Sequence, residues 1–143
     1  MHVSEVMTKP VVTIGLDESV RDIKEVFENT RIRHILVVDE GRLFGVVSER
    51  DLLKSMSPCL EDHLYTTRDL ALLNQRVHQI VIRNPFSLNF NAGVHELINI
   101  FKNKRIGCIP IVDDNAVPVG IVTRSDIFRN FDKICAVYFD RED

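Results

Sequence analysis

Cysteine is scarce in this 143-residue chain and forms no recognisable framework. The three cysteines, Cys59, Cys108 and Cys135, are odd in number and widely separated, so no set of disulfide bonds is indicated. Such usage is typical of a reducing compartment, and we expect a cytoplasmic protein. The sequence also has no Cys-x-x-Cys pair and no HExxH motif, so it gives no support to a metal site.

Long hydrophobic runs and a strong excess of one charge are absent as well. No apolar run approaches the roughly 20 residues that a membrane-spanning helix needs. The N-terminal stretch MHVSEVMTKP lacks the basic start and apolar centre of a secretion signal. The net charge is −3 at pH 7, which favours neither a phosphate backbone nor an anionic membrane surface. We therefore expect neither a nucleic acid nor a membrane as a partner.

The most informative feature that is present is an internal repeat. Residues 20–39 align with residues 94–113, and eight of these twenty aligned positions are identical. One extra residue in the following turn shifts the alignment, after which GVVSERD at 45–51 matches GIVTRSD at 120–126. The chain is therefore a tandem duplication.

Each copy carries the same order of local signals. A short apolar piece follows a proline, and a helical apolar pattern follows that piece. Two β-rich runs then flank a tight turn, HILVVDEGRLFGVVS in the first copy and CIPIVDDNAVPVGIVT in the second. A second helix begins after Ser48 or Thr123, whereas Pro110 and Pro118 indicate edge or bulged strand positions. We predict an α+β fold of two β-α-β-β-α units that pack on each other, because a unit of about 50 residues buries little surface alone.

The predicted organisation has four segments: repeat one at 1–54, a connector with a helix at 55–76, repeat two at 77–131, and a tail at 132–143. Within the connector, Ser57-Pro58 should end the preceding helix, and a loose stretch is expected near 59–65. Thr66 should cap the connector helix, whose apolar stripe includes Leu70 and Leu73. The pattern of the tail gives no assignment.

The repeated hydroxyl and carboxylate, Ser48 with Asp51 and Thr123 with Asp126, allow two interpretations. One is a capping box, in which the hydroxyl accepts from a first-turn N–H and the acid reaches back to the cap. The other is half of a nucleotide site. In that site the hydroxyl and the helix start bind a phosphate, and the acid accepts from the two hydroxyls of a ribose. These residues alone leave both interpretations open.

The order P-h-h-T, R-I-x-H-h-h-V-V-D and G-V-V-S-E-R-D, followed by its second copy, closely resembles a CBS domain pair, also called a Bateman module. The resemblance covers about Val3–Lys54 and Val77–Phe131. It implies that the repeats pack sheet to sheet with pseudo-two-fold symmetry and leave two clefts. It also implies a regulatory module that binds AMP, ADP or ATP, or less often S-adenosylmethionine or NADH, and that commonly forms a homodimer.

Carried over by position, the resemblance implies nucleotide-binding residues in both copies. The phosphate-side hydroxyls would be Ser48 and Thr123, and the ribose-binding acids would be Asp51 and Asp126. Thr13 and Ser87 would border the adenine. Arg33 and His34 would be phosphate-facing bases, present in copy one. Arg50 and Arg124 stand beside the motifs, where a guanidinium can neutralise phosphate charge. An apolar slot beside the adenine would be lined by Val12, Ile14, Ile35 and Val37 in copy one, and by Phe86, Leu88, Ile109 and Ile111 in copy two.

The two copies differ in charge around this site. Copy two has Gly107 and Cys108 where copy one has Arg33 and His34, and Glu49 adds a negative charge at the helix start of copy one. We therefore expect unequal clefts that favour monophosphates, with AMP the favoured regulatory ligand and no required cofactor.

Other functions find less support. Ser48, His34 and Asp51 are the residue types of a catalytic triad. However, a serine and an aspartate three residues apart cannot flank a histidine, and no G-x-S-x-G turn exists. Arginines within residues 31–50 alternate with acids, as on an ordinary mixed surface rather than an RNA-binding one. We predict a non-catalytic adenine-nucleotide sensor that acts on an unknown effector protein. The alternatives are a ligand-free interaction or dimerisation scaffold, and a module for S-adenosylmethionine or NADH.

Overall fold

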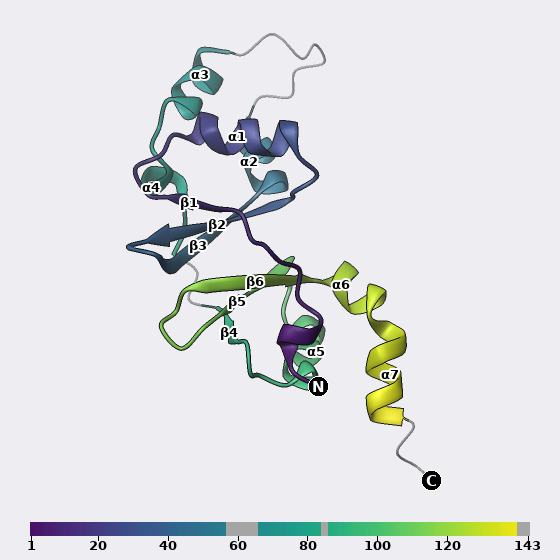
Figure 1. Ribbon diagram of the computed structural model, residues 1–143. Coiled ribbons are helices and arrows are strands. Elements are labelled where there is room, and N and C mark those ends of the chain that lie inside the picture. The colour runs from purple at the N-terminus through teal and green to yellow at the C-terminus, as the bar shows by residue number, and fades with distance from the viewer. Residues whose placement is uncertain (57–65, 84–85, 140–143) are drawn as a thin grey trace. The chain divides into compact units, whose positions relative to one another are not determined.

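The computed structural model describes residues 1–56, 66–83 and 86–139, which form helices and two mixed three-stranded sheets (Figure 1). The chain divides into two compact units. The first-repeat unit is Val12–Pro85, and the second-repeat unit combines Met1–Val11 with Phe86–Asp143. The predicted α+β fold with two β-α-β-β-α repeats is confirmed.

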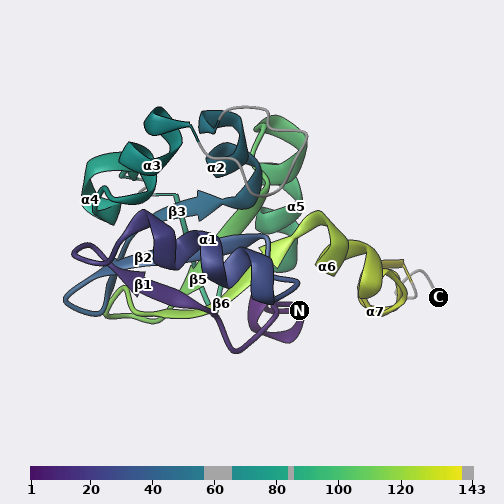
Figure 2. The same cartoon turned by 90° about the horizontal axis from the view of Figure 1, so that it is seen from above.

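The first-repeat unit contains one sheet with its helices on one face (Figures 1 and 2). The strands occur in the order β1-β2-β3, with β1 parallel to β2 and β3 antiparallel to it. Glu40 and Gly41 connect β2 to β3 with positive φ angles of 50° and 79°, the backbone that a two-residue hairpin of primed type requires. The elements are β1 (Thr13–Gly15), α1 (Val20–Asn29), β2 (His34–Asp39), β3 (Arg42–Ser48), α2 (Glu49–Ser55), α3 (Thr67–Leu73) and α4 (Val77–Ile80).

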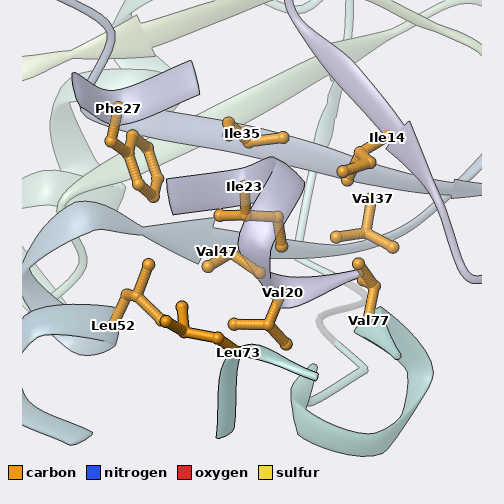
Figure 3. Packing of buried hydrophobic residues seen from close by; sticks show 10 residues of the cluster. All are labelled: Ile14, Val20, Ile23, Phe27, Ile35, Val37, Val47, Leu52, Leu73 and Val77. Atoms are coloured by element: carbon orange, nitrogen blue, oxygen red, sulfur yellow. The ribbon is translucent and has the colours of Figure 1, made fainter. Parts of the chain in front are cut away.

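The core of this unit lies between α1 and the sheet (Figure 3). α1 begins at Ser19, whose hydroxyl accepts from the Asp22 backbone N–H at 3.3 Å. Its buried side chains, Val20, Ile23 and Phe27, recur at the spacing of one helical face. They meet alternate residues of the strands together with Leu52, Leu73 and Val77.

The second-repeat unit repeats this arrangement with the strand order β4-β5-β6. Its elements are η1 (Val3–Glu5), β4 (Leu88–Asn89), α5 (Val94–Asn103), β5 (Cys108–Val112), β6 (Pro118–Thr123), α6 (Arg124–Arg129) and α7 (Phe131–Phe139). Its buried core consists of Val3, Val6, Val94, Leu97, Ile109, Ile111, Val122 and Ile134.

The two strand prolines occupy different places. Pro118 begins the edge strand β6 and lies next to a register shift, as predicted. Pro110 lies within the central strand β5, so the prediction of an edge or bulged position was wrong for this residue. Pro110 removes no hydrogen bond from the pairing of β5 with β6, because its partner Ile121 directs its own backbone N–H and C=O to Thr8.

Each unit is completed by a short segment that lies at the start of the other repeat in sequence. We call residues 1–8 and 75–83 the exchanged segments. Val3 donates its backbone N–H to Ala92 O at 2.8 Å, and the equivalent Val77 donates to Glu18 O at 2.8 Å. Ser4 N donates to Phe90 O, as the equivalent His78 N donates to Leu16 O. In the opposite direction, Val94 N donates to Met1 O, as the equivalent Val20 N donates to Gln75 O. The compact units therefore do not follow the repeat boundaries in sequence.

The connector helix α3 begins as predicted. Thr66 Oγ1 accepts from Asp69 N, and Asp69 Oδ2 accepts from Thr66 N, each at 3.1 Å. Leu73 is buried on this helix, whereas Leu70 is 43% exposed. Ser57-Pro58 and the stretch 59–65 lie outside the described residues. The described part of the tail, residues 132–139, lies in α7, which the sequence pattern did not indicate.

Because Val3 is fully buried in the second-repeat unit, we expect Val3→Ala to lower the free energy of unfolding by about 2 kcal/mol. Val117→Ala is the matched control, since Val117 is 38% exposed in the same unit and should change stability by less than about 0.5 kcal/mol. Urea unfolding of both variants measures the difference. Equal effects would contradict a structural role for the exchanged segment.

Candidate functional site

Both repeated motifs lie where a strand passes into a helix, and each forms a different half of a capping box. In copy one, Ser48 Oγ accepts from the Asp51 backbone N–H at 3.1 Å. In copy two, the Asp126 carboxylate instead accepts from the Thr123 backbone N–H at 2.8 Å. The capping interpretation therefore holds in part for each copy, and it leaves the two carboxylates in different states.

The carboxylate of Asp51 is exposed and open. Among the residues that the structure describes, none donates a hydrogen bond to it. Asp51 borders a cavity of about 590 Å³ within the first-repeat unit. The walls are mainly apolar and come from β3, α2, α3 and the exchanged segment: Val46, Val47, Leu52, Ser55, Leu72, Ile80, Val81, Ile82 and Arg83.

Arg83 places a positive charge on the cavity wall. It pairs with Gly45 in an isolated antiparallel bridge, and its guanidinium carbon lies 5.9 Å from the centre of the Phe44 ring. The sequence prediction missed Arg83 and its neighbour Ile82, because both lie at the start of the second repeat in sequence and yet belong to the first-repeat unit. No local sequence signal marks either residue as part of a site.

Arg33 and His34, the expected phosphate-facing bases, contribute little free positive charge near Asp51. Arg33 Nη1 lies 2.6 Å from Glu49 Oε1, so this guanidinium is already paired. His34 begins β2 opposite Ser48, and burial lowers its pKa, while the charge of Asp51 partly offsets that effect. His34 is therefore mainly neutral at pH 7. Arg50 is exposed on α2.

The carboxylate of Asp126 is closed by the protein itself. Asp126 is 3% exposed, and its Oδ1 accepts from Thr8 Oγ1 at 2.5 Å and from Arg129 Nη1 at 3.4 Å. Its Oδ2 accepts from the hydroxyl of Thr123 at 3.1 Å. Arg124 is also engaged, because it donates to Ile106 O at 2.9 Å and lies 5.3 Å from the Phe101 ring centre.

The residues expected around an adenine range from exposed to fully buried. Thr13 is exposed at the start of β1, and Ser87 is half-buried just before β4. The side chain of Ile109 is fully buried in the core of the second-repeat unit. Ile35 and Val37 are likewise core residues of the first-repeat unit, so a ligand could meet these three only through their backbone.

Cys108 replaces the histidine of copy one and supplies no charge. Burial raises its pKa to about 12, so the thiol stays protonated at neutral pH. Cys108 and Cys135 are both free thiols. Within residues 1–56, 66–83 and 86–139, no cluster of three His, Cys, Asp or Glu side chains could hold a metal ion. No helix in the same ranges has the length and apolar character to cross a membrane.

The lowered pKa of His34 makes folding depend on pH. Between the folded and unfolded pKa values the unfolded chain binds more protons, so stability should fall as pH drops below about 6.5 and level off below the folded pKa. His34→Gln should reduce this dependence in urea unfolding at pH 5 to 8. His95→Gln, on the exposed face of α5, is the matched control. An unchanged profile in His34→Gln would contradict the assignment.

Comparison with known proteins identifies the family. The CBS domain profile matches residues 3–58 and 77–133. The chain is similar to protein MJ1225 of Methanocaldococcus jannaschii, with 25% identity over 90% of this chain and 46% of that protein. It spans less than half the length of several curated relatives that it matches.

Solved structures give the same family. The CBS domain pair of protein MJ0100, crystallised with 5′-methylthioadenosine and S-adenosyl-L-methionine, has a TM-score of 0.71 and 28% identity. The match covers 94% of this chain and 98% of that one. An AcuB protein of Vibrio cholerae has a TM-score of 0.73 and 29% identity, over 100% of this chain and 98% of that one. The duplicated β-α-β-β-α fold and the paired profile matches together show that this chain belongs to the CBS domain family and contains a CBS domain pair.

Proposed function

We propose that the chain is a non-catalytic regulatory module that binds an adenosine-containing ligand beside Asp51 in the first-repeat unit. One observation carries this proposal: an exposed carboxylate, to which no described residue donates a hydrogen bond, borders a cavity of about 590 Å³. That volume lies within the range of small-molecule sites, which combine apolar walls with a few polar groups.

The chemistry of the cavity suits a nucleoside. A carboxylate can accept hydrogen bonds from both hydroxyls of a ribose, as acidic residues do in dinucleotide-binding folds. Val46, Val81 and Ile82 offer apolar surface against which a purine ring can pack. The ligands crystallised with the CBS domain pair of MJ0100 both contain adenosine, which supports this ligand class.

The charge of the cavity favours a ligand with few phosphate groups. Among the cavity-lining residues in the described part of the chain, Arg83 alone carries a positive charge. Arg33 is paired with Glu49, and His34 is mainly neutral. The proposed ligand therefore carries one phosphate or none, with AMP as the first probe, and ADP and ATP should bind more weakly.

Regulation would arise because the ligand lies between two parts of the first-repeat unit. A molecule in this cavity would contact α2 on one side and the exchanged segment at Ile80, Val81 and Ile82 on the other. Occupation would favour states in which these parts stay together, and it shifts an equilibrium only by its differential affinity for the two states. The change would pass to an effector protein or to dimer packing in the cytoplasm.

A second candidate function is a ligand-free scaffold. The bond from Asp51 N to Ser48 Oγ would stabilise the start of α2 with no ligand present. Such a scaffold would need no open carboxylate, and this favours the sensor.

Thermal unfolding separates the two functions. A ligand at 100 times its dissociation constant should add about 2.7 kcal/mol to the stability. AMP, ADP, ATP, NADH and S-adenosylmethionine should be tested in turn, and we expect AMP to raise the melting temperature most. A melting temperature that none of the five changes would favour the scaffold.

Replacing the acid tests its role directly. Asp51→Asn keeps the shape of the side chain and removes its charge, so AMP affinity should fall by about tenfold or more. Isothermal titration calorimetry measures this fall. Asp39→Asn, an exposed carboxylate at the end of β2, is the control and should bind as the wild type does. Equal affinity of Asp51→Asn and wild type would remove Asp51 from the site.

A further inference from the structure

The two exchanged segments place different residue types beside the repeated acids, Asp51 and Asp126. Thr8 pairs with Ile121 in the second-repeat unit, and Arg83 pairs with Gly45 in the first-repeat unit. The antiparallel register beside Arg83 places Ile82 opposite Val46, and Val46 occupies the strand position of Ile121. Ile82 is therefore the structural equivalent of Thr8.

The difference in residue type between Thr8 and Ile82 gives the two carboxylates different surroundings. The Thr8 hydroxyl donates to Asp126 Oδ1 at 2.5 Å, a short bond of the kind that a charged acceptor forms. Ile82 has no hydroxyl to donate, and its side chain is 83% exposed beside Asp51. The acid of copy two therefore has a partner from the exchanged segment, and the acid of copy one has none.

The bonds to Asp126 use the acceptors that a ribose would need. A carboxylate offers about four acceptor positions. Thr8 and Arg129 donate to Oδ1, while the N–H and the hydroxyl of Thr123 donate to Oδ2. Thr8 is also held by its own backbone, because its N–H donates to Ile121 O at 2.8 Å and its C=O accepts from Ile121 N at 3.1 Å.

We propose that Thr8 is a specificity-determining residue that limits the chain to one ligand, because its hydroxyl takes the place of a ribose hydroxyl on Asp126. The proposal rests on the proposed function at Asp51. Under this proposal the two copies differ in ligand affinity because the hydroxyl of Thr8 competes with a ribose hydroxyl for Asp126. The absence of the Arg33 and His34 equivalents in copy two adds to this difference. Thr8 acts as a positioning residue through Asp126.

Titration with AMP tests the number of sites. Wild type should bind one AMP per chain, and Thr8→Ala should bind two, because alanine removes both the hydroxyl and the space that it fills beside Asp126. Thr8→Ser keeps the hydroxyl without the methyl and should bind one. This comparison separates occupation of Asp126 from a general effect on folding. Two sites in wild type, or one site in a folded Thr8→Ala, would overturn the proposal.

The reciprocal change is made at Ile82. Ile82→Thr introduces a hydroxyl that can donate to Asp51, whereas Ile82→Val shortens the side chain without adding one. AMP should bind Ile82→Thr about tenfold more weakly than Ile82→Val. Equal affinities would contradict competition by the exchanged segment.

The outcomes also separate this proposal from the proposed function. One site in wild type that Asp51→Asn removes, with one site in Thr8→Ala, leaves the proposed function standing and refutes the role of Thr8. No binding by wild type, together with one site in Thr8→Ala that Asp126→Asn removes, supports the role of Thr8 and refutes the site at Asp51. No binding by either protein refutes both.

Discussion

The reciprocal exchange of short segments is the constraint on which the rest of the structure depends. Val3 completes the core of the second-repeat unit, and Val77 completes that of the first-repeat unit. The same backbone hydrogen bonds fix both segments. Because a unit of this size has little core of its own, each anchor contributes a large share of the buried surface. The exchange also brings Thr8 and Ile82 beside the repeated acids, so packing and candidate function share one cause.

The fold was largely predictable because its signals are local. The helical spacing of Val20, Ile23 and Phe27 and the cap formed by Thr66 and Asp69 depend only on near neighbours in sequence. The central position of Pro110 was not predictable in this way. It costs the β5–β6 pairing no hydrogen bond, because Ile121 bonds instead to Thr8, more than a hundred residues earlier.

The candidate site was predictable only in part, for the same reason. The motif identified Asp51 and Asp126, but it could not indicate that one is open and the other nearly buried. That difference depends on residues of the exchanged segments, which carry no local signature of a site. The pairing of Arg33 with Glu49 likewise depends on two strands meeting, so the sequence indicated the negative charge of Glu49 but not its partner.

The exchanged segments bear on how a duplicated chain of this kind could arise. A polypeptide with only one repeat would lack a place for its own leading segment and would leave its core incomplete. Two such polypeptides could complete each other by trading these segments, as domain-swapped dimers do. Joining them end to end would then convert a concentration-dependent assembly into an intramolecular one, after which the two halves were free to diverge at positions such as Thr8 and Ile82.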